Sequence, residues 1–412
     1  MNLRRLFLVL GFIAFVIFAI LAIYLVFFKT RLNPTNANTN SVSNTNGTLP
    51  NVNGNTNRTV VSNTNFPITN GRLTNGVTNT NASTIANGGL TQVSTIASGQ
   101  VTSANLNAQT GIIYFYDKAT QKFYQMTPGG TPREISSQLF PEASNITWTE
   151  NGDKAVIEFP DKSKIVYDFA ANKQYTLPQE SEGFSFDPQG DKLAYKYVPA
   201  NIDDRWLVTT NIDGSGVQFI ESIGEKASDV QVNWSPKGDV VATYRQSVDS
   251  NNQQVFFLGQ NSENNKALLT DGRGFEGRWS PSGDQILYSV YNSETNFNPT
   301  LYIANGSGDA IGTGKTALQL QTWPDKCTFS NSGTTVYCAT PQYLSSGSGL
   351  SGSSSSTARD DFYQINILTG EKRLLANPNI SVTANNLSLS ADGKTLYFTN
   401  KITGQLSSIR LP

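Results

Sequence analysis

The stretch WSPSGDQILY at Trp279–Tyr288 decides the fold of this 412-residue chain. Its first six letters recur with small changes at five other places, which begin at Trp148, Phe186, Trp234, Phe329 and Leu389. Each copy carries a glycine at the same position, namely Gly152, Gly190, Gly238, Gly283, Gly333 and Gly393. The intervals between these glycines are 38, 48, 45, 50 and 60 residues, which is the repeat length of a four-stranded propeller blade. The sequence therefore predicts a ring of repeated sheets.

Each copy has the composition of a β-hairpin. The aromatic residue or leucine ends one strand, Ser-Pro or its substitutes begin a tight turn, and the glycine supplies the positive φ that the turn needs. An apolar run such as Val240–Tyr244 then begins the next strand, which suits burial between neighbouring sheets. We therefore expect the repeated aromatic and glycine positions to pack blades together and to make turns. The alternative is an exposed platform of Trp148, Trp234 and Trp279 on which sugars stack.

The repeat, written W-S-P-x-G-x-x-[IL]-x-[YF], resembles the WD40-like repeats of the TolB-type β-propeller family. The resemblance extends over about residues 100–412. It implies an all-β ring of four-stranded antiparallel blades. It indicates the fold much more strongly than a partner, because propellers carry out many functions.

A seventh, degenerate hairpin lies upstream of the six clear copies. The stretch Leu106–Phe115 aligns without a gap with Trp279–Tyr288, with Thr110 in place of the glycine. Seven hairpins predict a seven-bladed β-propeller. Because the chain ends one strand short of a complete last blade, we expect Gln92–Ile96 to supply the missing outer strand and close the ring.

The N-terminal region predicts a membrane anchor. Residues 6–28 form a run of 23 residues without a charge, which as a helix is about 34 Å long and spans a bilayer. The run continues to Lys29 without the small residues of a signal-peptide cleavage site. We therefore expect residues 1–5 to be a cytoplasmic stub followed by an uncleaved transmembrane helix. Both flanks carry similar positive charge, so the orientation depends on the segment that follows.

Residues 29–90 predict a disordered linker between the helix and a propeller of residues 91–412. From Asn33 onward the segment is dominated by Asn, Thr, Ser and Gly and has no acidic residue, so it cannot build a core. Such a low-charge tether suits a cell exterior. We therefore expect a single-pass protein of the cell membrane with its N-terminus inside and its propeller extracellular or periplasmic. An adhesive or glycosylated stalk is the alternative to a plain spacer.

The two cysteines of the chain predict a disulfide. Cys327 and Cys338 lie at equal distances from the turn of one repeat. If Phe329 faces Val336 across this hairpin, Cys327 faces Cys338. Residues in such opposite positions have Cα atoms about 4.5–5.5 Å apart, which a disulfide tolerates. A disulfide needs an oxidising compartment, whereas two buried free thiols, the alternative, do not.

Composition limits the partners and the chemistry. All 31 acidic residues and 24 of the 30 basic ones lie at or after Asp117, so the propeller carries about −7 charges and is poorly suited to nucleic acid. The chain has no histidine, which excludes His-based triads and most zinc sites. No pair of carboxylates has a pattern that assigns it a catalytic role. We therefore expect no enzyme activity, no metal site and no cofactor.

The loops indicate a binding face. We expect the connection between the second and third strands to be short in blades one, two and seven and long in blades three to six. These connections share one side of the ring, here called the loop face, and loops on a rigid scaffold commonly bind partners. The candidate binding residues are Asp203, Asp204, Arg205, Asp249, Tyr291, Glu294 and Phe297. Functionless polar loops are the alternative, which we prefer for the Gly/Ser-rich run Ser345–Ser356.

Three functions are compatible with these features. The one we favour is a membrane-tethered interaction or scaffold module of the cell envelope with a protein partner. The second is a lectin-like sensor that binds a glycan or small ligand, for which the central channel is the expected site. The third and least favoured is a hydrolase or lyase that acts through carboxylates.

Overall fold

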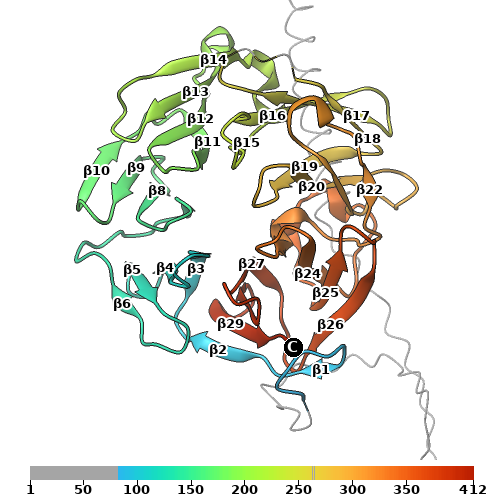
Figure 1. Cartoon of the computed structure of the whole chain (residues 1–412). Helices are drawn as coiled ribbons and strands as arrows, with labels where there is room; N and C mark the ends of the chain where they lie inside the picture. The colour runs from blue at the N-terminus through green and yellow to red at the C-terminus, as the bar shows by residue number, and fades with distance from the viewer. Residues whose placement is uncertain (1–81, 262, 264) are drawn as a thin grey trace, which may run out of the picture. The chain divides into compact units, whose positions relative to one another are not determined.

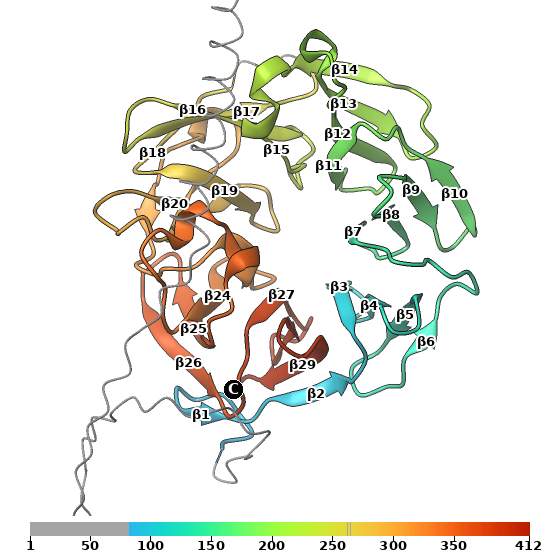
Figure 2. The ribbon, with the colours of Figure 1, turned by 180° about the vertical axis from the view of Figure 1, so that it is seen from behind.

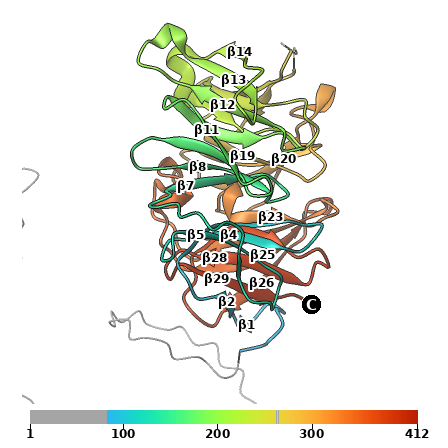
Figure 3. The ribbon, with the colours of Figure 1, turned by 90° about the vertical axis from the view of Figure 1, so that its left-hand side faces the viewer.

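Seven β-sheets surround a central axis in the computed structural model, which describes residues 82–261, 263 and 265–412. Figures 1 and 2 show this ring from its two faces, and Figure 3 shows it from the side. Each blade has four antiparallel strands, and the strand before the repeat turn lies nearest the axis. The chain is therefore an all-β, seven-bladed β-propeller, and the fold predicted from the repeat is confirmed.

The strands follow one order from the axis outward. Blade one contains β3 (Val101–Leu106), β4 (Ile113–Asp117), β5 (Lys122–Met126) and β6 (Arg133–Glu134). Blade two contains β7 (Asn145–Trp148), β8 (Lys154–Glu158), β9 (Lys164–Asp168) and β10 (Lys173–Thr176). Blade three contains β11 (Ser181–Phe186), β12 (Lys192–Tyr197), β13 (Trp206–Asn211) and β14 (Gln218–Ser222). Blade four contains β15 (Val230–Val232), β16 (Ala242–Ser247), β17 (Gln253–Leu258) and β18 (Leu268–Thr270).

The second half of the ring repeats this order. Blade five contains β19 (Arg273–Trp279), β20 (Gln285–Tyr291), β21 (Thr300–Asn305) and β22 (Thr316–Ala317). Blade six contains β23 (Cys327–Phe329), β24 (Thr335–Pro341), β25 (Asp360–Asn366) and β26 (Lys372–Pro378). Blade seven contains β27 (Ala384–Leu389), β28 (Thr395–Asn400), β29 (Gln405–Arg410) and, as its outer strand, β2 (Ser94–Ala97).

Short 3-10 helices lie in the connections. They are η1 (Ile202–Asp204), η2 (Gly224–Asp229), η3 (Gly308–Ala310), η4 (Pro324–Lys326), η5 (Ser348–Leu350) and η6 (Ser353–Ser355). Over the residues that the structure describes, no helix has the length and apolar character needed to cross a membrane. The predicted membrane span, residues 6–28, and most of the predicted linker lie outside the described residues.

The six repeat turns share one geometry. In each, the glycine N–H donates to the carbonyl three residues earlier, and the glycine φ lies between 70° and 79°. Glycine adopts this left-handed conformation without steric cost. The hairpin of blade one differs, because Gly111 instead of the aligned Thr110 has the positive φ, 69°, and donates to a carbonyl four residues earlier. Its strands nevertheless pair in the register seen in the other blades.

The repeat aromatic positions pack between blades. The buried ones are Phe186, Trp234, Trp279, Phe329 and Leu389. Trp279 of blade five, for example, meets Phe257 of blade four edge to face, with ring centroids 5.9 Å apart. Trp148 of blade two is partly exposed, but its ring centroid lies 5.9 Å from that of Tyr114 in blade one. Burying such a side chain stabilises the fold by about 1.5–3 kcal/mol, so these residues hold neighbouring blades together.

The N-terminal strand β2 closes the ring. It pairs antiparallel with β29 and completes the four strands of blade seven, as Figure 2 shows at the foot of the ring. The closure predicted for Gln92–Ile96 is therefore confirmed, with the strand at Ser94–Ala97. Closure of this kind joins the two ends of the ring by backbone hydrogen bonds and leaves blade seven without an unpaired edge at β29.

The segment just before β2 is also packed against the ring. β1 (Leu90–Thr91) adds a parallel fifth strand to β26 of blade six. Ala86 is fully buried, and its N–H donates to the carbonyl of Arg410 at 2.8 Å. Residues 83–90, which we expected to belong to the linker, therefore lie on blades six and seven. Their few apolar side chains gave no periodic signal in the sequence.

A disulfide joins the two inner strands of blade six. Cys327 on β23 lies directly opposite Cys338 on β24, with Cα atoms 4.1 Å apart, and the two sulfur atoms are bonded. Phe329 faces Val336 in the same register, as the sequence predicts. Both cysteines are fully buried, so the bond is shielded from solvent.

Candidate functional site

The connections on the loop face differ in length from blade to blade. Between the second and third strands they span residues 198–205 in blade three, 292–299 in blade five and 342–359 in blade six. Those of blades one, two and seven have four or five residues. Blade four was expected to carry a long loop, but β16 and β17 continue to Ser247 and Gln253 and leave five residues between them. The prediction for blade four is therefore wrong, because strand pairing extends further than its polar sequence suggested.

The 18-residue connection of blade six is held against its neighbours. Its Gly349 N–H donates to Phe297 O of blade five at 2.9 Å, and Lys401 Nζ of blade seven donates to Ser356 O at 3.0 Å. The approach at Gly349 is so close that a Cβ there would lie 2.8 Å from Phe297 O and from Tyr291 Cβ. The Gly/Ser run that we took for a functionless loop is therefore docked across blades five to seven.

The predicted binding residues all lie at the loop face. They are Asp203, Asp204 and Arg205 in blade three, Asp249 in blade four, and Tyr291, Glu294 and Phe297 in blade five. Tyr291 and Phe297 come together with ring centroids 6.5 Å apart. The blade-six loop contacts both of them, whereas Glu294 is exposed beside them. The structure therefore joins the blade-five residues to blade six, and not to the blade-three group.

The carboxylates of blades three and four make local bonds. Asp204 Oδ2 accepts a hydrogen bond from Asn201 Nδ2 at 2.8 Å beside η1. Asp249 Oδ1 accepts the backbone N–H groups of Asn251 and Asn252 at 2.7 Å each. Hydrogen bonds from the Asn252 side chain and from the Asn251 backbone hold the pKa of Asp249 below its usual value. Both carboxylates therefore stabilise the turns in which they lie.

Several large apolar side chains are exposed on the loop face, and only Phe297 among them was singled out from the sequence. Val248 of blade four is 57% exposed, Phe297 of blade five 40%, and Tyr343 and Leu350 of blade six 72% and 64%. We call these four residues the exposed loop set. A signal for Val248, Tyr343 and Leu350 was available in the sequence, because each is a large apolar residue within a mainly polar connection.

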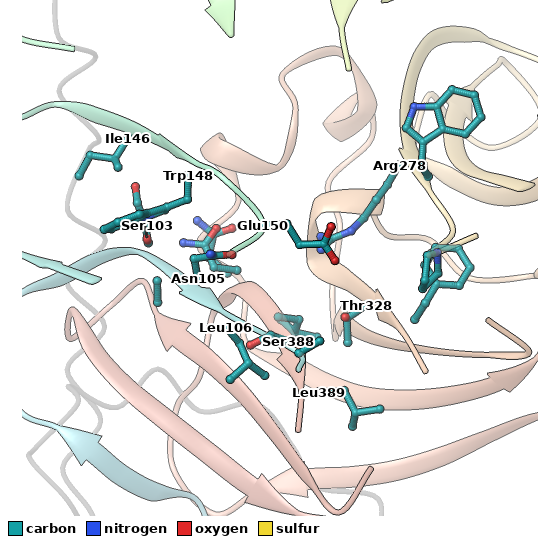
Figure 4. A pocket seen from close by; sticks show the side chains of 18 of the residues that line it. Ser103, Asn105, Leu106, Ile146, Trp148, Glu150, Arg278, Thr328, Ser388 and Leu389 are labelled. Carbon is teal, nitrogen blue, oxygen red and sulfur yellow. Dashed lines mark hydrogen bonds between the residues drawn. The ribbon is translucent and has the colours of Figure 1, made fainter. Parts of the chain in front are cut away.

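A cavity of about 880 Å³ lies at the centre of the ring (Figure 4). Its wall comes mainly from the inner strands β3, β7, β19, β23 and β27 and from the repeat turns. The lining is rich in amides and hydroxyls, among them Asn105, Thr328 and Ser388. Arg278 and Glu150 are the two ionisable side chains among the lining residues that the structure describes. The volume is in the range of small-molecule sites.

Arg278 extends into this cavity from β19, directly before the repeat aromatic Trp279 (Figure 4). Burial lowers the pKa of its guanidinium, and the charge of nearby Asp325 opposes this shift. Sequence reasoning did not single out Arg278. The signal lay in comparing the repeats, because the other six copies carry Asn, Ser or Thr at this position.

A second perturbed group, Glu276, lies two residues earlier on β19. Burial raises its pKa to about 7, with a further rise from the charge of Asp325 and an opposing effect of Arg245. The blade-six loop lies over it, since a Cβ on Gly352 would be 3.7 Å from Glu276 Oε1. Asp325 itself accepts a hydrogen bond from the Ser353 hydroxyl of the same loop. The loop therefore contacts two carboxylates, of which Glu276 is partly buried and Asp325 is exposed.

A buried ion pair fixes the position of η4. Lys326 Nζ lies 2.7 Å from Asp360 Oδ2, and both side chains are almost fully buried. The same nitrogen donates to Ala384 O at 3.1 Å, and Ala384 N–H donates to Asp360 Oδ2 at 2.7 Å. Removing one member of such a pair leaves an uncompensated charge and costs about 3–5 kcal/mol. The pair holds Asp325 and the end of the blade-six loop in place.

The sequence matches no protein-family model, and no curated protein sequence matches it. Its fold is similar to that of solved β-propellers. The β-propeller domain of Cps50 (Swd1) from Myceliophteria thermophila is 12% identical, with a TM-score of 0.53 over 78% of this chain and 100% of that one. TolB from Acinetobacter baumannii is 15% identical, with a TM-score of 0.44 over 67% of this chain and 63% of that one. At 12% identity the likeness to the Cps50 propeller shows the fold alone.

Proposed function

We propose that this chain is a membrane-tethered β-propeller that binds a protein partner of the cell envelope through its loop face, with the ring outside the cytoplasm. The propeller fold is compatible with a protein-interaction module. The observation that carries the proposal is the exposed loop set, Val248, Phe297, Tyr343 and Leu350, which stands on connections fixed by hydrogen bonds.

The fixed backbone makes this surface suited to binding. Aromatic and large apolar side chains at the centre of an interface contribute most of the binding energy. A loop that must become ordered on binding loses about 0.5–1.5 kcal/mol for each immobilised side chain. The bond from Gly349 to Phe297 O already orders the backbone beside Phe297 and Leu350. Exposed polar residues such as Glu294 supply the polar rim that surrounds an interface core.

Two features support the tether and the location. The uncharged run of residues 6–28 has the length of a bilayer span. The disulfide between Cys327 and Cys338 forms and persists in an oxidising environment. A tether followed by a long polar segment holds the ring away from the membrane and leaves the loop face free to meet a partner.

The proposed role is binding without catalysis. The chain lacks the histidine that general acid–base sites use most often. The carboxylates of Asp204 and Asp249 are occupied by turn-forming hydrogen bonds. These hydrogen bonds stabilise turns on the loop face, which favours a structural role for both carboxylates over a catalytic one.

The interaction is tested with the full-length protein expressed in its membrane. Residue-selective crosslinking in intact cells compares the wild type with the variant Phe297→Ser, Tyr343→Ser, Leu350→Ser. We expect the amount of partner crosslinked to the variant to be at least tenfold lower than for the wild type, because the variant lacks the exposed apolar side chains that would contact the partner. The matched control is Val217→Ser, Phe219→Ser, Leu368→Ser, which removes three exposed apolar side chains at the opposite ends of the strands of blades three and six. Equal capture by both variants contradicts the loop face as the interface.

The location is tested with one introduced thiol. Thr131→Cys places it on an exposed turn, while Cys327 and Cys338 are protected in their disulfide. We expect a membrane-impermeant maleimide to label this variant in intact cells to the same extent as in permeabilised cells. Labelling that requires permeabilisation contradicts a ring outside the cytoplasm and leaves the interaction test unaffected.

A further inference from the structure

Blade five departs from the other six blades at the wall of the central cavity. The residues directly before the repeat aromatic positions are Asn105, Thr147, Ser185, Asn233, Arg278, Thr328 and Ser388. Strand pairing makes them equivalent, since Arg278 lies opposite Leu287 as Asn105 lies opposite Tyr114. Six are small and uncharged, and the seventh is an arginine. Blade packing does not require the arginine, because six blades of the same ring form without one.

The guanidinium of Arg278 makes no ion pair or hydrogen bond with the part of the chain that the structure describes. Over residues 82–412, as far as the structure describes them, its guanidinium has no hydrogen-bond partner within 3.5 Å and no ion-pair partner within 4.0 Å. An arginine stays protonated in proteins, and Arg278 is only partly buried, so solvent in the cavity reaches its charge. Asp325 favours the charged form but acts from beyond ion-pair distance. The guanidinium therefore faces the cavity with its donors available.

The rest of the wall offers groups that match hydroxyls. Asn105, Asn385 and Asn386 line the cavity, and an amide both donates and accepts hydrogen bonds. Asn105 Nδ2 donates to Thr149 O at 3.1 Å, which fixes the side chain, and its Oδ1 accepts no hydrogen bond from the residues that the structure describes. Glu150, from the repeat turn of blade two, adds one acceptor (Figure 4). A molecule rich in hydroxyls finds donors and acceptors on several sides of this cavity.

We propose that the central cavity binds a small organic acid rich in hydroxyl groups, with the chemistry of an acidic sugar. Its single carboxylate accepts hydrogen bonds from the Arg278 guanidinium, and its hydroxyls bond to the amide walls. An arginine and a carboxylate form two parallel hydrogen bonds, which orient the ligand as well as attract it. The site is separate from the loop face and does not depend on the protein partner.

The surrounding charges select a ligand with one negative charge. Glu276 and Asp325 lie near the same strand and loop, and Glu150 lies on the wall itself. A ligand with several negative charges meets repulsion from these carboxylates and only one balancing cation. Nucleic acids and polyphosphates therefore do not fit this cavity, whereas one carboxylate does.

The site is tested by calorimetric titration of the detergent-solubilised full-length protein with sodium glucuronate at constant ionic strength. Glucose, which lacks the carboxylate, and acetate, which lacks the hydroxyls, are titrated in parallel. We expect glucuronate to bind at least tenfold more tightly than either. Arg278→Gln should weaken glucuronate binding at least tenfold, and Arg278→Lys should weaken it less, because lysine keeps the charge but not the paired geometry. Arg273→Gln, which removes an exposed arginine of the same strand, should leave binding unchanged.

Thermal melting supplies an independent readout of folding and binding. Without ligand, Arg278→Gln should melt at about the wild-type temperature, because the partly exposed guanidinium makes no hydrogen bond or ion pair with the residues that the structure describes. Glucuronate should raise the melting temperature of the wild type and of Arg273→Gln but not that of Arg278→Gln. No binding of glucuronate to the wild type at millimolar concentration overturns the proposal. So does equal binding by Arg278→Gln, and equal binding of acetate and glucuronate overturns the role of the amide walls.

Discussion

The two faces of the ring are made by the same seven blades but are built differently. On the face of the repeat turns, six glycines adopt φ values within 10° of one another and close the same hydrogen bond. On the loop face, the connections vary from four residues in blade one to 18 in blade six. The turn face is uniform because each inner hairpin must fit between two neighbours around the axis. The loop face is free of this restriction.

This difference separates stability from recognition. Changes at the repeat turns should act on the global stability of the ring, because each turn positions a buried aromatic residue and two inner strands. Changes on the loop face should act on local order and on binding, because the described residues of those connections contribute no side chain to the buried apolar core. The predictions below test this division, beginning with the turn face.

The largest effect is expected for Gly152→Val on the turn face. A Cβ at this glycine overlaps the ring of Tyr114 on blade one, and its φ is 73°. The steric overlap costs about 1–3 kcal/mol, and holding a β-branched residue at positive φ costs a similar amount. We therefore expect the free energy of unfolding to fall by about 4 kcal/mol in chemical denaturation.

The equivalent change Gly393→Val is the control for steric contact. This glycine has φ of 70°, but a Cβ added to it would have no neighbouring atom within 4 Å. Only the backbone cost of about 2 kcal/mol should remain. Equal losses for Gly152→Val and Gly393→Val show that contact between blades does not add to the cost of the turn.

The disulfide of blade six should give the next largest effect. Replacing Cys327 and Cys338 together by Ala opens a closed loop of about 12 residues, for which chain entropy predicts a loss of about 3 kcal/mol. The turn end of the hairpin, which the disulfide braces, should lose most of its protection from hydrogen exchange. The wild type under reducing, partly denaturing conditions should approach the variant, and the variant should not respond to reductant. A variant as stable as the oxidised wild type shows that the hairpin does not need the bond.

Most of the turn face could be predicted from the sequence. The spacing of the glycines, the seventh hairpin at Leu106–Phe115, the closing strand near Gln92–Ile96 and the opposition of Cys327 and Cys338 follow from a period and from strand register. These are local rules that act over a few residues or repeat at a fixed interval. The positive φ at Gly111 was missed because a one-residue change of turn type leaves the strand register unchanged.

The loop face and the cavity could be predicted only in part. The long connections of blades three, five and six were recognised, but the docking of Gly349 on Phe297 joins residues of two blades through backbone atoms and has no sequence pattern. Residues 83–90 were placed in the linker because their contacts are with the far end of the chain. Arg278 differs from its six counterparts in one letter, which becomes meaningful once the strands are known to surround a cavity.

The stability of the protein should depend on pH through the partly buried carboxyl of Glu276. Glu276 has a folded-state pKa of about 7, raised from 4.5 mainly by burial. Its contribution to stability is therefore fully present below about pH 4.5 and is lost as the pH rises through 7. Burial of Asp360 raises its pKa and acts in the same direction. We expect Glu276→Gln to be more stable than the wild type by about 2–3 kcal/mol at pH 8 and similar to it near pH 4.5.

The measurement is chemical denaturation of both proteins between pH 4.5 and pH 8. Glu294→Gln, which removes an exposed glutamate of the same blade, should follow the wild-type curve. A constant difference between Glu276→Gln and the wild type over this range contradicts the raised pKa. It indicates instead that the substitution acts through packing.

The smallest change in global stability is expected for Gly349→Ala in the docked loop of blade six. Its added methyl group would lie 2.8 Å from Phe297 O and from Tyr291 Cβ, so the loop must move away from blade five. The core beneath is untouched, and surface changes of this kind usually alter the free energy of unfolding by less than about 0.5 kcal/mol. Limited proteolysis should nevertheless cleave the loop at least several times faster, because local opening governs cleavage there. Ser351→Ala, an exposed change in the same loop, should leave the rate unchanged. If Gly349→Ala lowers global stability as much as Gly393→Val, the loop face contributes to holding the ring together and the division between the two faces is wrong.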